Sequence, residues 1–212
     1  MTTAFLIAFV LVGLAELGDK SQLLLLGFAA RYRPIKVIIG AAIAIAILQA
    51  IGVVAGGLIG AYLPERVVAI VAGLLFIGFG IATWRTTEED AGESVTRPMR
   101  FGPVLTVAAA LFIGELGDKT QVMTMSIAAD PAASIRALGA FGAGLTPPEP
   151  GAFLTGLGVW LGSSLGFLVA DMVAIFTGAV LGSRLPERAI SRVSAAVFVV
   201  FGLITFVSAF AR

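Results

Sequence analysis

The sequence contains no cysteine and no histidine. Without cysteine the chain has no disulfides and no thiolate ligands, so nothing in it reports the redox state of its compartment. Without histidine it has no imidazole ligands, which excludes zinc-protease, haem-histidine, Ser-His-Asp and Cys-His chemistry. Any metal ion must therefore be bound by hard oxygen ligands, with at most a thioether in addition. Such ligands suit cations like Mg²⁺, Ca²⁺ and Mn²⁺.

Charged residues are also scarce. They make up 13% of the 212 residues, against about 25% in an average soluble domain. Apolar residues make up 58% and occur in long runs, and the mean hydropathy is +1.03. The net charge of +1 and the lack of a basic tract give no indication of nucleic-acid binding. This composition excludes a soluble enzyme and is typical of an integral membrane protein.

Six apolar segments are long enough to cross a bilayer, which takes about 20 residues of helix. We expect helices, because only helices and closed barrels satisfy the backbone in lipid, and these runs are too long for barrel strands. The predicted fold is an all-α integral membrane protein with six transmembrane helices. Their predicted limits are residues 3–28, 35–62, 65–84, 104–128, 155–181 and 187–210.

The chain repeats itself. Residues 16–22, ELGDKSQ, recur 99 positions later as ELGDKTQ, and residues 63–66, LPER, recur 122 positions later. The difference between the offsets lies in residues 130–151, where we expect a loop with room for a short interfacial helix. We divide the chain into a first three-helix repeat (1–84), a linker (85–103) and a second three-helix repeat (104–212).

An odd number of helices in each repeat means that the two copies have opposite orientations in the membrane. Inverted repeats are typical of secondary transporters, whose site lies near the midplane where the repeats meet. The loops after the first, third and fifth predicted helices hold nine lysines and arginines, against three on the opposite side. The positive-inside rule then makes the linker cytoplasmic and both termini non-cytoplasmic. We interpret the N-terminal run as a retained helix rather than a signal peptide.

The repeated motif places charges in the middle of two predicted helices. At about 1.5 Å per residue, its glutamates lie near the bilayer centre. Each charge there costs roughly 2.5–3.5 kcal/mol on insertion scales, so these groups must face one another, a cavity or an ion. The charged residues are Glu16, Asp19 and Lys20 in the first copy and Glu115, Asp118 and Lys119 in the second.

The spacing within each copy favours one shared site. Positions i, i+3 and i+4 lie on one face of a helix, so two inverted helices can line one cavity. Four carboxylates and two ammonium groups sum to −2, which one divalent cation neutralises. Gly18 and Gly117 allow either close helix packing or local unwinding that exposes carbonyl ligands. Further oxygens are available from Ser21, Gln22, Thr120 and Gln121.

Two more polar residues lie inside predicted helices. At the offset of 122, Gln49 corresponds to Asp171, and each occupies the second helix of its repeat. We interpret Asp171 as a ligand, a proton carrier or a gate, and Gln49 as its weaker counterpart. The alternative is a helix–helix hydrogen bond at each position.

The motif E-φ-G-D-[K/R]-[S/T], present twice in six predicted helices, resembles that of the Golgi-type calcium/manganese transporter family (the GDT family). The resemblance extends over the whole chain, and both copies match in full. It implies cation/proton antiport, with manganese export in bacterial members, and cation ligands at Glu16, Asp19, Glu115 and Asp118. The chain lacks the N-terminal extension of eukaryotic members, which implies a bacterial protein of the inner (cell) membrane.

We therefore expect a secondary active transporter rather than an enzyme. Its expected substrate is Mn²⁺, with Ca²⁺ next, exported by alternating access in exchange for protons. Desolvation and like charge both disfavour ionised carboxylates, so protons and metal should compete for the same oxygens. The expected partners are the divalent cation, protons and the lipid bilayer. We expect no cofactor besides the transported ion, and we assign no oligomeric state.

Three other interpretations stay open at this point. The first is an exporter of a small organic cation or amino acid, although no aromatic cage or apolar pocket is evident. The second is a membrane scaffold in which the motif charges form structural ion pairs, whose stability would not depend on metal. The third is an intramembrane hydrolase with paired aspartates, against which the lysines and the duplication argue.

Overall fold

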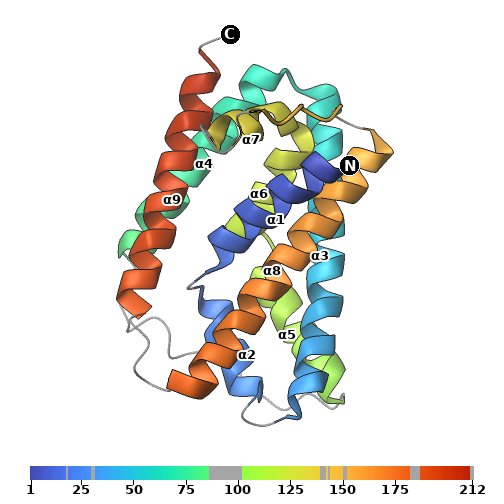
Figure 1. Cartoon of the computed structure of the whole chain (residues 1–212), viewed down its shortest axis with the longest axis vertical. Coiled ribbons are helices and arrows are strands. Elements are labelled where there is room, and N and C mark those ends of the chain that lie inside the picture. Colours follow the sequence, from blue (N-terminus) through green and yellow to red (C-terminus); the bar gives the residue numbers. More distant parts are fainter. Residues whose placement is uncertain are drawn as a thin grey trace.

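The computed structural model describes residues 1–17, 19–29, 32–85, 102–138, 142, 144–149, 152–181 and 187–210, and the linker residues 86–101 lie outside this set. Within the described residues the regular secondary structure is helical, and the helices form one bundle (Figure 1). Their bounds are α1 Thr2–Glu16, α2 Lys20–Ala29, α3 Pro34–Tyr62, α4 Glu65–Arg85, α5 Pro103–Glu115, α6 Lys119–Ala129, α7 Pro131–Ala137, α8 Phe153–Leu181 and α9 Glu187–Ser208.

Four of these helices agree with the predicted spans. The bounds of α3, α4, α8 and α9 differ from the predicted limits by at most two residues. The short helix α7 lies in the segment predicted as a loop after the second motif. Asp130 caps its start by accepting a hydrogen bond of 2.9 Å from the backbone N–H of Ala133.

The first and fourth predicted spans, residues 3–28 and 104–128, were wrong as continuous helices. Each is two helices, separated by a break at the repeated motif. Leu17 and Leu116 are extended, and Gly117 has φ +82°, a left-handed conformation that glycine adopts without steric cost. The break therefore separates the motif glutamate from the aspartate, and the predicted common helical face does not exist.

Helices from the two predicted repeats pack against each other. Helix α1 packs along α8, while α5 and α6 pack along α3, and α3 also contacts α8. Glycines make the close approaches: Gly162 of α8 lies against the backbone of Phe5, and Gly56 of α3 lies against the backbone of Met125. The first span of each half thus packs on the second span of the other half.

The third spans of the two predicted halves, α4 and α9, pack against each other at one side of the bundle (Figure 1). Gly73 of α4 and Gly202 of α9 face each other across this crossing, so that a side chain on either would meet the other's carbonyl oxygen. Phe76 and Phe201 pack edge to face beside them, with ring centroids 5.1 Å apart.

The outer surface of the bundle suits a membrane. The segments Pro34–Tyr62 and Phe153–Val173 are long and apolar enough to cross a bilayer, and three shorter apolar helical segments accompany them. On α3 large apolar side chains recur on the exposed face every three or four residues, while small and polar residues such as Gly52 and Gln49 are buried. The first residues of α1 and the last residues of α9 lie towards the same end of the bundle (Figure 1).

We predict that Gly56→Leu destabilises the protein, because its side chain would collide with the backbone of α6 at Met125. Overpacking of this kind costs about 1–3 kcal/mol or more. Gly57→Leu is the matched control, since no atom outside α3 lies within 4 Å of the position of its Cβ. Thermal unfolding of the detergent-purified protein should show a lower melting temperature for the first variant only. Equal melting temperatures would contradict the packing described.

Candidate functional site

The two helix breaks bring three acidic side chains together. Glu16 is the last residue of α1, Asp19 lies in the first break, and Glu115 is the last residue of α5. Each of them offers one carboxylate oxygen, and these oxygens lie within 4.8 Å of one another. Both glutamates are buried, with exposed fractions of 0% and 4%. Residues 99 positions apart in the sequence thus form one acidic cluster.

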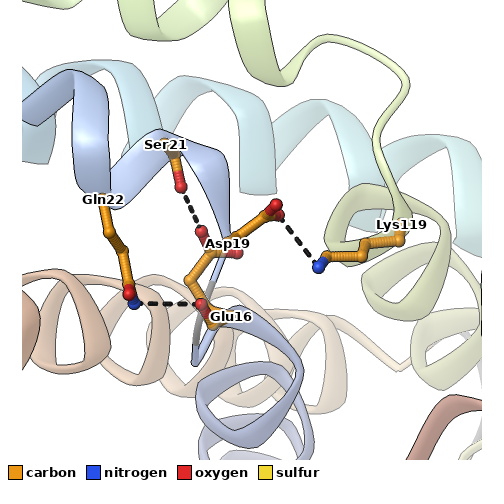
Figure 2. Close-up of polar contacts among 5 residues, drawn as sticks. All are labelled: Glu16, Asp19, Ser21, Gln22 and Lys119. Atoms are coloured by element: carbon orange, nitrogen blue, oxygen red, sulfur yellow. Dashed lines mark hydrogen bonds and ion pairs between the residues drawn. The ribbon is translucent and has the colours of Figure 1, made fainter. Parts of the chain in front are cut away.

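An ion pair joins the two motif copies. The ammonium Nζ of Lys119, the first residue of α6, lies 3.1 Å from Oδ2 of Asp19, and both side chains are almost fully buried. Figure 2 shows Lys119 reaching across from its own helix towards Asp19. Asp118 precedes α6 and also interacts with Asp19. The aspartates of both copies therefore belong to the same cluster.

The first break is supported by the residues that follow it. Ser21 Oγ donates a 2.6 Å hydrogen bond to Glu16 Oε1, and Gln22 Nε2 donates a 3.0 Å bond to the backbone oxygen of Glu16 (Figure 2). The same oxygen also accepts a 3.2 Å bond from the backbone N–H of Asp19, so two donors close the end of α1. The side chain of Lys20 lies outside the described part of the structure.

The second break is supported by Gln121. Its Oε1 accepts a 2.6 Å hydrogen bond from the backbone N–H of Gly117, and its Nε2 donates a 3.4 Å bond to the backbone oxygen of Leu48 on α3. Thr120 is buried, and its backbone oxygen accepts a bond from Thr124 Oγ1. Gln22 and Gln121, predicted as oxygen ligands of the metal, each form hydrogen bonds with backbone groups at their own break. The sequence carried no signal for Leu48, because it contributes only a carbonyl.

Several carboxylate oxygens of the site lack a hydrogen-bond partner among the described residues. They include Glu16 Oε2, Glu115 Oε2 and Asp118 Oδ2. Asp118 is the N-cap of α6, yet its side chain makes no capping hydrogen bond. Leaving buried charged oxygens unpaired is costly, so this arrangement favours a cation between them.

Two further buried polar residues lie on the long helices that flank the breaks. Asp171 on α8 is 1% exposed and interacts electrostatically with Asp19, Glu16 and Glu115. Gln49 on α3 is also 1% exposed, and it follows Leu48, which binds the second break. The site thus combines groups from both breaks with groups from the two helices that flank them.

The ends of the broken helices add to the field at the site. Glu16 and Glu115 stand at helix C-termini, the ends of helices that carry partial negative charge. Such carbonyl ends of discontinuous helices coordinate cations in transporters. With five acidic residues and the Lys119 ammonium in the described part of the site, the charges suit a divalent cation bound by hard oxygens.

The sequence matches one known protein family. The family model described as "Divalent cation/proton antiporter GDT1" matches residues 4–91 and 152–212, more than half of the chain. The matched stretches contain the first motif copy together with Gln49 and Asp171, and the second copy lies between them. No solved structure matches the chain.

Individual relatives match either nearly all of the chain or a part of it. A Vibrio cholerae protein whose name proposes manganese export is 29% identical over 202 residues, covering 94% of this chain and 88% of that protein. A GDT1-like protein of Synechocystis is 25% identical over 225 residues, covering 97% and 98%. GDT1-like protein 3 of Arabidopsis thaliana is 39% identical over 83 residues, covering 39% and 28%. The chain belongs to the divalent cation/proton antiporter family GDT1, a family of transporters rather than enzymes.

Proposed function

We propose that this protein exports Mn²⁺, with Ca²⁺ as the next candidate, in exchange for protons. Glu16, Asp19, Glu115 and Asp118 bind the cation. The observation that carries the proposal is the convergence of carboxylate oxygens from two separate helix breaks to within 4.8 Å of one another. Oxygens on opposite sides of a Ca²⁺ ion lie roughly 5 Å apart, at metal–oxygen distances of about 2.3–2.6 Å. A single ion can therefore contact both motif copies.

Protons use the same oxygens as the metal. A carboxylate must lose its proton before it binds a cation, so metal binding releases protons and metal affinity falls as pH falls. Inward-moving protons then displace the cation on the outer side of the membrane. Lys119 takes part as a tethered cation, because its ammonium occupies Asp19 and must yield that carboxylate when the metal arrives.

Alternating access supplies the transport step. The two predicted repeats are inverted relative to each other, which is supported by the reciprocal packing of α1 on α8 and of α5 and α6 on α3. The breaks lie near the middle of two of the six proposed membrane spans, between α1 and α2 and between α5 and α6. In this topology the α2, α5 end of the bundle faces the bacterial cytoplasm, and both termini face away from it.

The scaffold alternative accounts for fewer of the contacts. Structural ion pairs would neutralise the buried acids, yet in the described part of the site the ion pair is Lys119–Asp19. That interpretation does not account for the oxygens of Glu16, Glu115 and Asp118 that lack a hydrogen-bond partner among the described residues. Binding a cation gives each of them one.

We predict that Mn²⁺ raises the melting temperature of the purified protein, and that this effect weakens from neutral to acidic pH. A ligand at 100 times its Kd stabilises the native state by about 2.7 kcal/mol. Protons that occupy the carboxylates lower the apparent affinity and hence the shift. Thermal unfolding with Mn²⁺, Ca²⁺ and Mg²⁺ at two pH values measures this. The absence of a shift with every metal at both values would argue against a metal site.

We also predict that E16Q, D19N, E115Q and D118N each abolish Mn²⁺ transport driven by a pH gradient in proteoliposomes. Each substitution removes one negative charge with little change in shape, so the variants should still fold. Glu149→Gln is the control, because it makes the same change at an exposed position away from the site. Wild-type transport rates in all four site variants would refute the assignment.

A further inference from the structure

Asp171 is an unusual residue in the middle of a long apolar helix. It lies on α8, is 1% exposed, and neither of its carboxylate oxygens has a hydrogen-bond partner among the described residues. A buried carboxylate with no donor loses its hydration without compensation. Burying Asp171 therefore destabilises the fold unless another group interacts with its carboxyl.

The charges that act on Asp171 are themselves negative. Asp19 is the group that acts on it most directly, and it in turn acts on Glu16 and Glu115. The ammonium of Lys119, described in this site, is paired with Asp19. Like charges repel, so a cation bound among these carboxylates would stabilise Asp171 as well.

A simple role in helix packing does not explain the residue. Helix α8 approaches α1 through Gly158, Gly162 and Gly166, which contact the α1 backbone directly. Its contact with α3 includes a 2.8 Å hydrogen bond from Trp160 Nε1 to the backbone oxygen of Ala46. These contacts hold α8 in place without any hydrogen bond from Asp171.

Gln49 occupies the matching position on the other side of the site. It lies 122 positions earlier, on α3, is 1% exposed, and its Oε1 has no partner in the described residues. The preceding residue, Leu48, is bonded to Gln121 in the second break. Each break is therefore flanked by one buried polar residue from the long helix on which it packs, a carboxylate on α8 and an amide on α3.

We propose that Asp171 is a fifth carboxylate ligand of the transported divalent cation and that the Gln49 amide oxygen lies opposite it as a neutral ligand. The proposal rests on the proposed function and extends its ligand set beyond the two motifs. It makes the site asymmetric: the breaks are near copies, but the flanking ligands differ by one charge. The cation is then held more strongly on the α1–α8 side.

The test compares Mn²⁺ binding by the full-length wild type and Asp171→Asn in detergent at one fixed pH. We expect the Kd for Mn²⁺ to rise at least about tenfold. Without metal, the variant should not melt lower than wild type, because Asp171 makes no hydrogen bond among the described residues that the substitution could break. A purely structural role predicts the reverse: a lower melting temperature and an unchanged Kd, and that outcome would overturn the proposal.

Two further variants sharpen the comparison. Ser163→Ala removes another buried polar group of α8, whose Oγ donates to the backbone oxygen of Trp160, and should leave the Kd within about twofold of wild type. The double variant Q49D/D171Q moves the carboxylate to the matching position and should bind Mn²⁺ more tightly than D171N. A Kd no better than that of D171N would overturn the placement of Gln49 opposite Asp171.

The two proposals fail in different ways. If neither wild type nor Glu16→Gln binds Mn²⁺, the proposed function itself is wrong. If wild type binds Mn²⁺, Glu16→Gln does not, and Asp171→Asn binds as tightly as wild type, only the fifth ligand is wrong.

Discussion

The structure depends on the cost of interrupting two helices inside a membrane. Each break exposes backbone groups and places a glutamate and an aspartate where water is excluded, which is unfavourable unless other groups compensate. Gln22 and Gln121 bind the freed backbone groups, and Lys119 neutralises Asp19 across the two copies. These contacts do not satisfy every group, because several carboxylate oxygens have no hydrogen-bond partner among the described residues. A divalent cation bound between them would supply the missing interaction.

The packing of the bundle follows from the need to bring the two breaks together. Glycines on α3 and α8 let each broken helix approach a long unbroken one, so the motifs meet although they lie far apart in sequence. Because each half contributes its broken helix to the other half's long helix, a shift between halves would move all the proposed ligands. This gives the fold a physical route from ion binding to a change of access, which is what antiport requires.

Much of this architecture could be predicted from the sequence, and the exceptions have clear causes. Long apolar runs gave α3, α4, α8 and α9 to within two residues, and the duplicated motif gave the acidic cluster. The breaks at Leu17 and Leu116 were one of two open possibilities, because the motif glycines allow unwinding while a Glu-x-x-Asp-Lys spacing fits a continuous helical face equally well. Gln22 and Gln121 form hydrogen bonds with backbone groups that are free only once the helix is broken, and their role as ligand oxygens stays a prediction. The inverted orientation of the halves stays a prediction.

The central claim is that both breaks form one site, shared by one divalent cation and by protons. The most direct test is calorimetric titration of the purified protein with Mn²⁺ in two buffers of different ionisation enthalpy, which counts both bound ions and released protons. We predict one Mn²⁺ per chain with release of protons on binding. Two independent Mn²⁺ sites per chain, or binding with no proton release, would contradict the account.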